Sequence, residues 1–213
     1  EAMTVDIDAD DLSIALECMS IKTFSVVSHN SNGSKSNNSE LYDVVHEGNF
    51  VRIFTIADSD RNFGSSTGLV AVKSLNEVYL SDDHASRLEN EFELSRYLAP
   101  KCSSVRAALM QAKVDEFPAI FLEWVPGMTL SQWITSFHKN LQISSSSDNL
   151  KHSSIISERD MKTILQLARY ITKALADIHG AGATHNNFSP DNIIVDSINV
   201  HINMVVKIIG LGS

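Results

Sequence analysis

The chain has 213 residues and a formal net charge of -9. This length allows one domain or two small lobes with a buried core. The acidic balance argues against a surface for nucleic acids or anionic membranes, because both need basic patches. No apolar run approaches the roughly 18 residues of a spanning helix. Cys18 and Cys102 are the only cysteines and lie far apart, which favours a reducing compartment, the cytoplasm, over a disulfide framework.

The first 40 residues are predicted to be a poorly ordered segment and linker. Residues 1–27 mix acidic and apolar side chains without one period, and residues 29–40 form a Ser/Asn/Gly tract that buries too little apolar surface to fold. The chain begins at Glu1 without a Met and stops at Ser213 directly after a predicted strand. We therefore expect both ends to be cut from something longer.

Three strands are predicted between residues 41 and 75, where β-branched and aromatic runs flank a turn cluster. Strand alternation in the last of them places Val70 and Val72 on one face, and Ala71 and Lys73 on the other. A lysine that follows a small residue on the inward face indicates a cleft rather than a core.

An amphipathic helix is predicted over residues 81–98, and Pro100 stops it. At about 100° per residue, one face carries a stripe of Leu88, Phe92, Ser95 and Leu98. Glu91 lies inside this stripe, whereas Glu89 and Glu93 lie outside it and are interpreted as solvated acids. A carboxylate on the packed face needs a partner, because burying an unpaired charge is costly.

A long helix is the clearest element of the second half. Before it, an apolar strand over residues 119–125, a short helix over residues 130–137 and a Ser-rich insertion over residues 141–154 are predicted. Ser157 and Asp160 make a capping-box-like start, and Gly180 is predicted to be the C-cap. The apolar face that keeps the helical period is Met161, Ile164, Leu165, Ala168, Ile171, Leu175 and Ile178.

The turn after this helix reads His-Asn-Asn-Phe-Ser-Pro-Asp-Asn over residues 185–192, and an apolar tail ends at Gly212. A polar turn between a helix and a strand is where a scaffold presents chemical groups. The turn resembles the catalytic loop of the protein kinase family, His-Arg-Asp-Leu-Lys-Pro-x-Asn, with matches at His185, Pro190 and Asn192. The tail resembles the Asp-Phe-Gly strand that follows this loop.

Three further blocks resemble the family in the required order. Lys73 matches the strand lysine that holds nucleotide phosphates, Glu91 matches its helix partner, and residues 122–127 resemble the gatekeeper and hinge. The resemblance implies an α+β fold of two protein-kinase-like lobes. The small lobe would span residues 41–125, and a hinge with a partial large lobe, through the degraded tail motif, would span residues 126–213.

The resemblance also implies a cleft for the adenine and phosphates of ATP. The positions that would contact the nucleotide are Gly48, Ile53, Ala71, Lys73, Leu122, Glu123, Val125 and Ile194, with Ile209 just before the tail motif.

Several positions depart from the family's pattern. The phosphate-covering loop keeps only Gly48, and Ser189 replaces a phosphate-contacting lysine. Asn187 stands where the catalytic base Asp is expected, and Gly210 stands where the metal-binding Asp is expected. Asn192 would then be the sole remaining metal ligand. These departures imply weak ATP binding that depends little on Mg²⁺.

Two functions remain open at this stage. One is a pseudokinase, a signalling or scaffolding module that binds a protein partner and transfers little or no phosphate. The alternative is an active serine/threonine-type kinase with atypical groups, because Lys73, Glu91 and Asn192 are retained. The loop also weakly resembles the kinase-like domains of large hybrid sensor histidine kinases. Small-molecule phosphotransferases share the fold but also use the base Asp.

Overall fold

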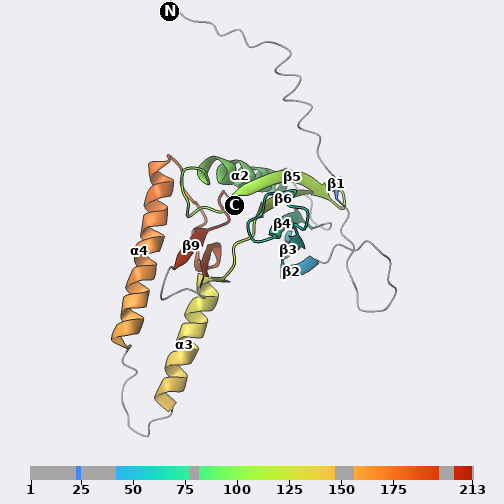
Figure 1. Cartoon of the computed structure of the whole chain (residues 1–213). Helices are drawn as coiled ribbons and strands as arrows, with labels where there is room; N and C mark the ends of the chain where they lie inside the picture. The colour runs from blue at the N-terminus through green and yellow to red at the C-terminus, as the bar shows by residue number, and fades with distance from the viewer. Residues whose placement is uncertain (1–22, 25–41, 77–81, 147–155, 197–203, 213) are drawn as a thin grey trace, which may run out of the picture.

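The computed structural model describes residues 23–24, 42–76, 82–146, 156–196 and 204–212, and the account below concerns these residues. Their fold is α+β, as predicted, with two sheets and helices around them (Figure 1). The predicted N-terminal segment and linker lie outside the described residues, except for Thr23 and Phe24, which form a short strand.

The larger sheet has the strand order β1-β5-β6-β4-β3-β2. Its neighbouring strands are antiparallel, apart from β1, which runs parallel to β5. The strands are β1 (Thr23–Phe24), β2 (Tyr42–Glu47), β3 (Val51–Ala57), β4 (Leu69–Leu75), β5 (Ala108–Val114) and β6 (Phe117–Glu123). The three strands predicted between residues 41 and 75 are thus confirmed as β2, β3 and β4.

The smaller sheet is antiparallel and has the order β7-β8-β9. Its strands are β7 (Met128–Thr129), β8 (Ile193–Asp196) and β9 (Val205–Ile208), and a 3-10 turn, Pro190–Asn192, leads into β8. The helices are α2 (Asp82–Leu98), α3 (Leu130–Ser146) and α4 (Glu158–Gly180). Helix α2 packs on β5 and β6, whereas α4 packs on β9 and α3 on β7, β8 and the 3-10 turn (Figure 1).

Strand β4 separates two apolar clusters, as its alternation predicts. Val70 and Val72 are fully buried in one cluster with Phe54 of β3. Ala71 lies in the other cluster, which Leu88 of α2 joins. The face of β4 that carries Lys73 is therefore the face that α2 covers.

Helix α2 buries the predicted stripe and ends at Leu98, as expected. Its buried residues are Leu88, Glu91, Phe92, Ser95 and Leu98, whereas Glu89 and Glu93 are exposed. Hydrophobic periodicity identified the packed face correctly, including the acid within it.

Strand β5 has no counterpart among the predicted elements. It forms a hairpin with β6 through a two-residue turn in which Asp115 and Glu116 have φ of 51° and 69°. Two-residue hairpin turns with positive φ at both positions usually carry Asn-Gly or Asp-Gly. The pair Asp-Glu carries no such signal, so the hairpin could not be recognised from its turn.

Helix α3 is longer than predicted and enters the region assigned to a Ser-rich insertion. It continues to Ser146, and residues 147–155 lie outside the described part. At its start, the Thr129 hydroxyl accepts from the Gln132 backbone at 3.2 Å and the Gln132 side chain accepts from the Thr129 backbone at 3.0 Å. This capping box starts the helix, and serines lower helix stability too little to stop it after Phe137.

Helix α4 begins as predicted but ends differently. The Ser157 hydroxyl accepts from the Asp160 backbone at 3.1 Å, which confirms the cap. Gly180 is the last helical residue rather than the C-cap, which is Ala181. The left-handed conformation that ends many helices falls on Gly182, with φ of 82°.

The buried face of α4 also differs from the predicted stripe. Leu167, Ala174 and Ile178 are buried, whereas Met161 and Leu165 are 43% and 63% exposed. The predicted Ala168 is exposed, and Ile164, Ile171 and Leu175 are half-buried. Figure 1 shows the reason, because the first turns of α4 extend away from both sheets and only its later turns pack on β9.

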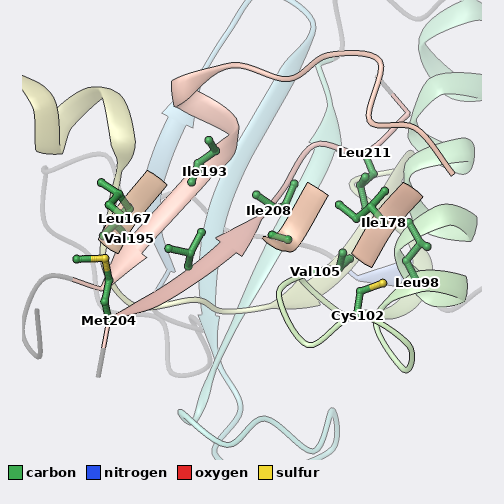
Figure 2. Packing of buried hydrophobic residues seen from close by; sticks show 12 residues of the cluster. Leu98, Cys102, Val105, Leu167, Ile178, Ile193, Val195, Met204, Ile208 and Leu211 are labelled. Carbon is green, nitrogen blue, oxygen red and sulfur yellow. The ribbon is translucent and has the colours of Figure 1, made fainter. Parts of the chain in front are cut away.

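One apolar cluster joins the smaller sheet to the connection between α2 and β5 (Figure 2). Ile208 and Val195 contribute from the sheet, Ile178 from α4, and Cys102 and Val105 from the connection. Cys102 is a free thiol, and burial raises its pKa above the ordinary value, with the nearby carboxylate of Asp177 adding to the shift. The connection is therefore part of the core that underlies the site described next.

Candidate functional site

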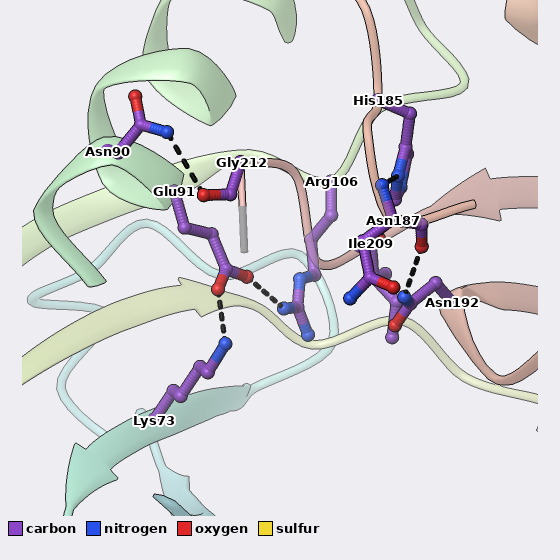
Figure 3. Close-up of polar contacts among 9 residues, drawn as sticks. All are labelled: Lys73, Asn90, Glu91, Arg106, His185, Asn187, Asn192, Ile209 and Gly212. Atoms are coloured by element: carbon purple, nitrogen blue, oxygen red, sulfur yellow. Dashed lines mark hydrogen bonds and ion pairs between the residues drawn. The ribbon is translucent and has the colours of Figure 1, made fainter. Parts of the chain in front are cut away.

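Lys73 lies in the interior of the larger sheet, where β4 is paired on both sides. Its cross-strand partners are Ile53 on β3 and Ile120 on β6. Its side chain is 16% exposed and points to the side of the sheet that α2 covers (Figure 3). The sheet thus holds the lysine stem while its ammonium group reaches Glu91.

Glu91 is the centre of a buried charged cluster. Lys73 Nζ donates to its Oε2, which confirms the ion pair predicted between the strand and the helix. Arg106 Nη2 donates to Oε1 of the same carboxylate at 3.3 Å. The Glu91 side chain is only 1% exposed, so each of its oxygens faces one cation and little water (Figure 3).

Arg106 was not identified from the sequence. It follows Val105 just before β5, and its backbone N–H donates to the carbonyl of Ile208 at 3.1 Å. Burial lowers the pKa of the Arg106 guanidinium below its ordinary value, and the nearby charge of Glu91 opposes that shift. The sequence did contain one signal, because Arg106 is a single charge in an apolar run. An arginine that is buried with such a run requires a carboxylate partner.

A second ion pair links the two sheets next to this cluster. Lys207 Nζ of β9 lies 3.1 Å from Oε2 of Glu123, at the end of β6. Glu123 Oε2 also accepts from the Ala107 backbone at 3.2 Å, and Lys207 donates to the carbonyl of Val105 at 3.3 Å. The side chain of Glu123, predicted as a hinge position, is therefore engaged in contacts with β9 and with the segment that carries Arg106.

These five charged side chains do not cancel. Three cations, Lys73, Arg106 and Lys207, face two carboxylates, Glu91 and Glu123, so the cluster carries one excess positive charge. The whole chain has a net charge of -9. These five side chains therefore form a locally positive region at the junction of the two sheets, although the whole protein is acidic.

The polar loop after α4 is held to the end of β9 by His185. This ring is 3% exposed, and its Nε2 lies 2.9 Å from the carbonyl oxygen of Ile209. Its Nδ1 accepts from the Asn187 backbone at 3.3 Å, so the proton is assigned to Nε2, which donates. The ring also meets Phe188 edge-on at 5.6 Å. His185 therefore supports the loop by packing and hydrogen bonding.

Asn192 fills the space beside Gly210. Its side-chain amide donates to the carbonyl of Asn187 at 2.8 Å (Figure 3). Gly210 has φ of 69°, and a Cβ added there would lie 2.8 Å from Asn192 Oδ1. A larger residue at 210 therefore needs Asn192 to move. The structure brings Asn187, Asn192 and Gly210 together, as the motif predicts.

The donor groups of this loop do not fit a magnesium ion. Mg²⁺ is usually bound through one or two carboxylates with phosphate oxygens and water. Asn187 and Asn192 offer neutral amides, Gly210 has no side chain, and Asp191 is exposed. Among the described residues, no group of three or more His, Cys, Asp or Glu side chains could hold a metal ion.

Part of the predicted nucleotide cleft lies on one face of the larger sheet. Ile53 pairs with Lys73 across the ladder, and Ala71 pairs with Leu122, so these four side chains share a face. Ala71 and Leu122 are buried and Ile53 is half-buried. The remaining positions are half-buried and lie elsewhere: Gly48 after β2, Val125 between the sheets and Ile194 on β8.

Sequence comparison with family models and with curated proteins finds no match. The sequence matches no known protein family. It also matches none of the curated proteins to which it was compared. The motif resemblance and the geometry above are therefore what a functional proposal can rest on. Among the described residues, no helix combines the length and apolarity needed to cross a membrane.

Proposed function

We propose that this chain is a protein-kinase-like domain and a pseudokinase, a signalling or scaffolding module with little or no phosphoryl transfer. One observation carries the proposal. Lys73 and Glu91 form the strand-to-helix ion pair of the family's pattern, while the loop has Asn187 and Gly210 in place of its two acids.

The chemistry of the loop supports the non-catalytic reading. A general base typically contributes about 10²- to 10⁴-fold to a rate, and the Asn187 amide cannot accept a hydroxyl proton. His185 cannot replace it, since its Nδ1 accepts from the loop backbone and its Nε2 faces the Ile209 carbonyl. Phosphoryl transfer otherwise depends on positioning and metal charge, and the loop lacks the carboxylates that hold Mg²⁺.

The proposed ligand is ATP, bound weakly and with little dependence on Mg²⁺. Ile53, Ala71 and Leu122 are apolar side chains on the Lys73 face of the sheet, where Ala71 and Leu122 are buried and Ile53 is half-buried, so Ile53 is the one of the three that an adenine ring would contact. In this proposal Lys73 contacts a phosphate of ATP. A protein partner completes the proposal, and its proposed compartment is the cytoplasm, consistent with the free buried thiol of Cys102.

The second candidate is an active serine/threonine-type kinase with atypical groups. The intact Lys73–Glu91 ion pair favours it, as does Asn192 in its motif position. This candidate requires a proton acceptor other than Asn187.

Transfer of labelled γ-phosphate from ATP separates the two candidates. The full chain and its Lys73→Ala variant are incubated with ATP and Mg²⁺, with a generic protein substrate and alone. We expect both proteins to remain at the same background. Transfer by the wild type well above the Lys73→Ala control overturns the pseudokinase proposal in favour of the kinase.

A further inference from the structure

A groove lies between α2 and the hairpin of β5 and β6, and its volume is about 230 Å³. Apolar side chains and polar ones of both charges line it, among them Ala85, Leu88, Glu89, Gln111, Lys113 and Pro118. Ala85 and Pro118 are half-buried, so part of their apolar surface remains accessible in the groove. An apolar cavity of roughly 150 Å³ can hold a molecule of the size of benzene. This groove therefore has room for one branched aliphatic side chain.

The outer edge of β5 runs beside this groove. Strand β5 lies between β6 and β1 in the sheet (Figure 1). However, β1 covers only the end of β5, where Thr23 is level with Lys113 and Phe24 is level with Val114. Before Lys113, no strand among the described residues pairs with this edge. An edge strand presents a row of backbone N–H and C=O groups that can pair with a further strand.

The register of β1 determines which residues would cover this edge. Because β1 and β5 are parallel, Ile21 comes level with Gln111 when β1 is continued backwards along the chain. Lys22 then comes level with Ala112. Residues that are level in neighbouring strands carry their side chains on the same face of a sheet. Gln111 lines the groove, whereas Ala112 packs in the cluster on the other face. The continued strand would therefore direct Ile21 towards the groove.

The sequence before β1 fits this continuation. Met19-Ser20-Ile21-Lys22 alternates apolar and polar residues, which is the pattern of a strand with one buried face. The segment also needs no separate binding event to reach the groove, because β1 already pairs with β5 beside Lys113. Such tethering gives a segment a high effective concentration at its site. A segment of this chain is therefore favoured over a separate protein as the occupant.

We propose that residues 19–22 continue β1 along the edge of β5 and that the Ile21 side chain occupies the groove. Ile21 then contacts Ala85 of α2 and Pro118 of β6 from the same position. This docking holds α2 against the sheet, and α2 is the helix that presents Glu91 to Lys73. The inference does not depend on nucleotide binding or on the proposed function.

Hydrogen exchange of the full chain, resolved to single amides by mass spectrometry, tests the added pairing. Wild type is compared with Ile21→Asp and with Ile14→Asp, a matched control that makes the same change in the same segment but outside the proposed strand. In Ile21→Asp, we expect the amides of residues 109–112 that face the outer edge to exchange at least about tenfold faster. The reason is that burying one Ile side chain stabilises a segment by at least this factor.

The control should leave these exchange rates within about twofold of wild type. Equal rates in wild type and Ile21→Asp overturn the proposal. An equal acceleration by Ile14→Asp also overturns it, because the effect would then not belong to the register of β1.

Cross-linking identifies the occupant even if Ile21→Asp disturbs the fold. Ile21→Cys is made in a chain with Cys18→Ser, and the remaining Cys102 is buried. It is combined with Glu89→Cys, which lies at the groove, or with Arg96→Cys. Arg96 is also exposed and lies about 10 Å further along the same side of α2. Both double variants are treated with a short bismaleimide, and the products are separated by denaturing electrophoresis.

We expect the intramolecular product to form with Glu89→Cys in at least about fivefold higher yield than with Arg96→Cys, because the docked segment is close to the first position only. Equal yields overturn the proposal. A product that mainly joins two chains also overturns it, because a second copy would then be the occupant of the groove.

Discussion

Replacing Glu91 by Ala leaves two cations facing each other in a buried space. The carboxylate is 1% exposed, and the Lys73 and Arg106 side chains that it holds are 16% and 11% exposed. Solvent therefore does little to compensate either cation after the substitution. Removing one partner of a buried ion pair typically costs about 3–5 kcal/mol.

This cost should appear directly in the stability of the full chain. For a domain of this size, each kcal/mol lowers Tm by about 2–4 °C, so we expect Tm to fall by about 6–20 °C. The change in the free energy of unfolding is measured by urea denaturation followed by circular dichroism. The gain in helix propensity from Glu to Ala is only a few tenths of a kcal/mol and does not alter the direction.

Helix α2 offers matched controls for this substitution. Glu89→Ala and Glu93→Ala make the same chemical change on exposed positions of the same helix. They should change stability by no more than about 0.5 kcal/mol. If Glu91→Ala falls within about 1 kcal/mol of these controls, the carboxylate is not a buried counter-charge and the reasoning fails. Replacing Lys73, Glu91 and Arg106 together by Met should instead be nearly neutral or stabilising, because no unpaired charge remains.

Three further predictions concern the loop, α4 and the core. Gly210→Ala should lower stability by about 1–3 kcal/mol in urea denaturation, and by more than Gly182→Ala, because both have positive φ but only the first new Cβ meets Asn192. Ser157→Ala should cost about 1 kcal/mol in the same assay, and no loss of stability would show that the hydroxyl does not cap the helix. Cys102 should alkylate with iodoacetamide at pH 8 far more slowly in the native protein than in urea, as measured by peptide mass spectrometry, because burial raises its pKa and leaves less thiolate. The neutral Cys102 thiol also contributes to the free energy of unfolding. This contribution is fully present below the pKa of the thiol in the unfolded chain, and it is lost as pH rises through the raised pKa of the folded protein. Equal native and denatured rates would contradict both statements.

Local patterns predicted the elements whose signals are short-range. The stripe of α2 identified Glu91 as a packed acid, because the 3.6-residue period alone separates it from Glu89 and Glu93. The Ser157 cap of α4 was recognised from two side chains three residues apart. The pairing of Lys73 with Glu91 was implied by the resemblance to the protein kinase family, and the predicted faces of the strand and the helix agree with it.

What the sequence did not reveal depends on contacts between distant segments. Nothing near Arg106 in the chain indicates that it faces Glu91, since the pair forms only when α2 and the segment before β5 pack together. Similarly, an apolar stripe shows which side of α4 can be buried but not how far the packing extends, so Leu165 was assigned to the core and is exposed. The close approach of Asn192 to Gly210 also arises only in three dimensions.

The segment between α2 and β5 makes the two sheets mechanically dependent on each other. Within this segment, the Ser104 carbonyl accepts from the backbone N–H of Ile208, and the Arg106 backbone N–H donates to the Ile208 carbonyl. The Arg106 side chain donates to Glu91 of α2, the helix that covers the larger sheet. A movement that separates the two sheets at this segment must therefore break its hydrogen bonds to Ile208 or the ion pair between Arg106 and Glu91. Residues 104–106 are hydrogen-bonded to β9 through their backbone, and the Arg106 side chain forms an ion pair with Glu91 of α2. The positions of α2 and β9 therefore depend on each other.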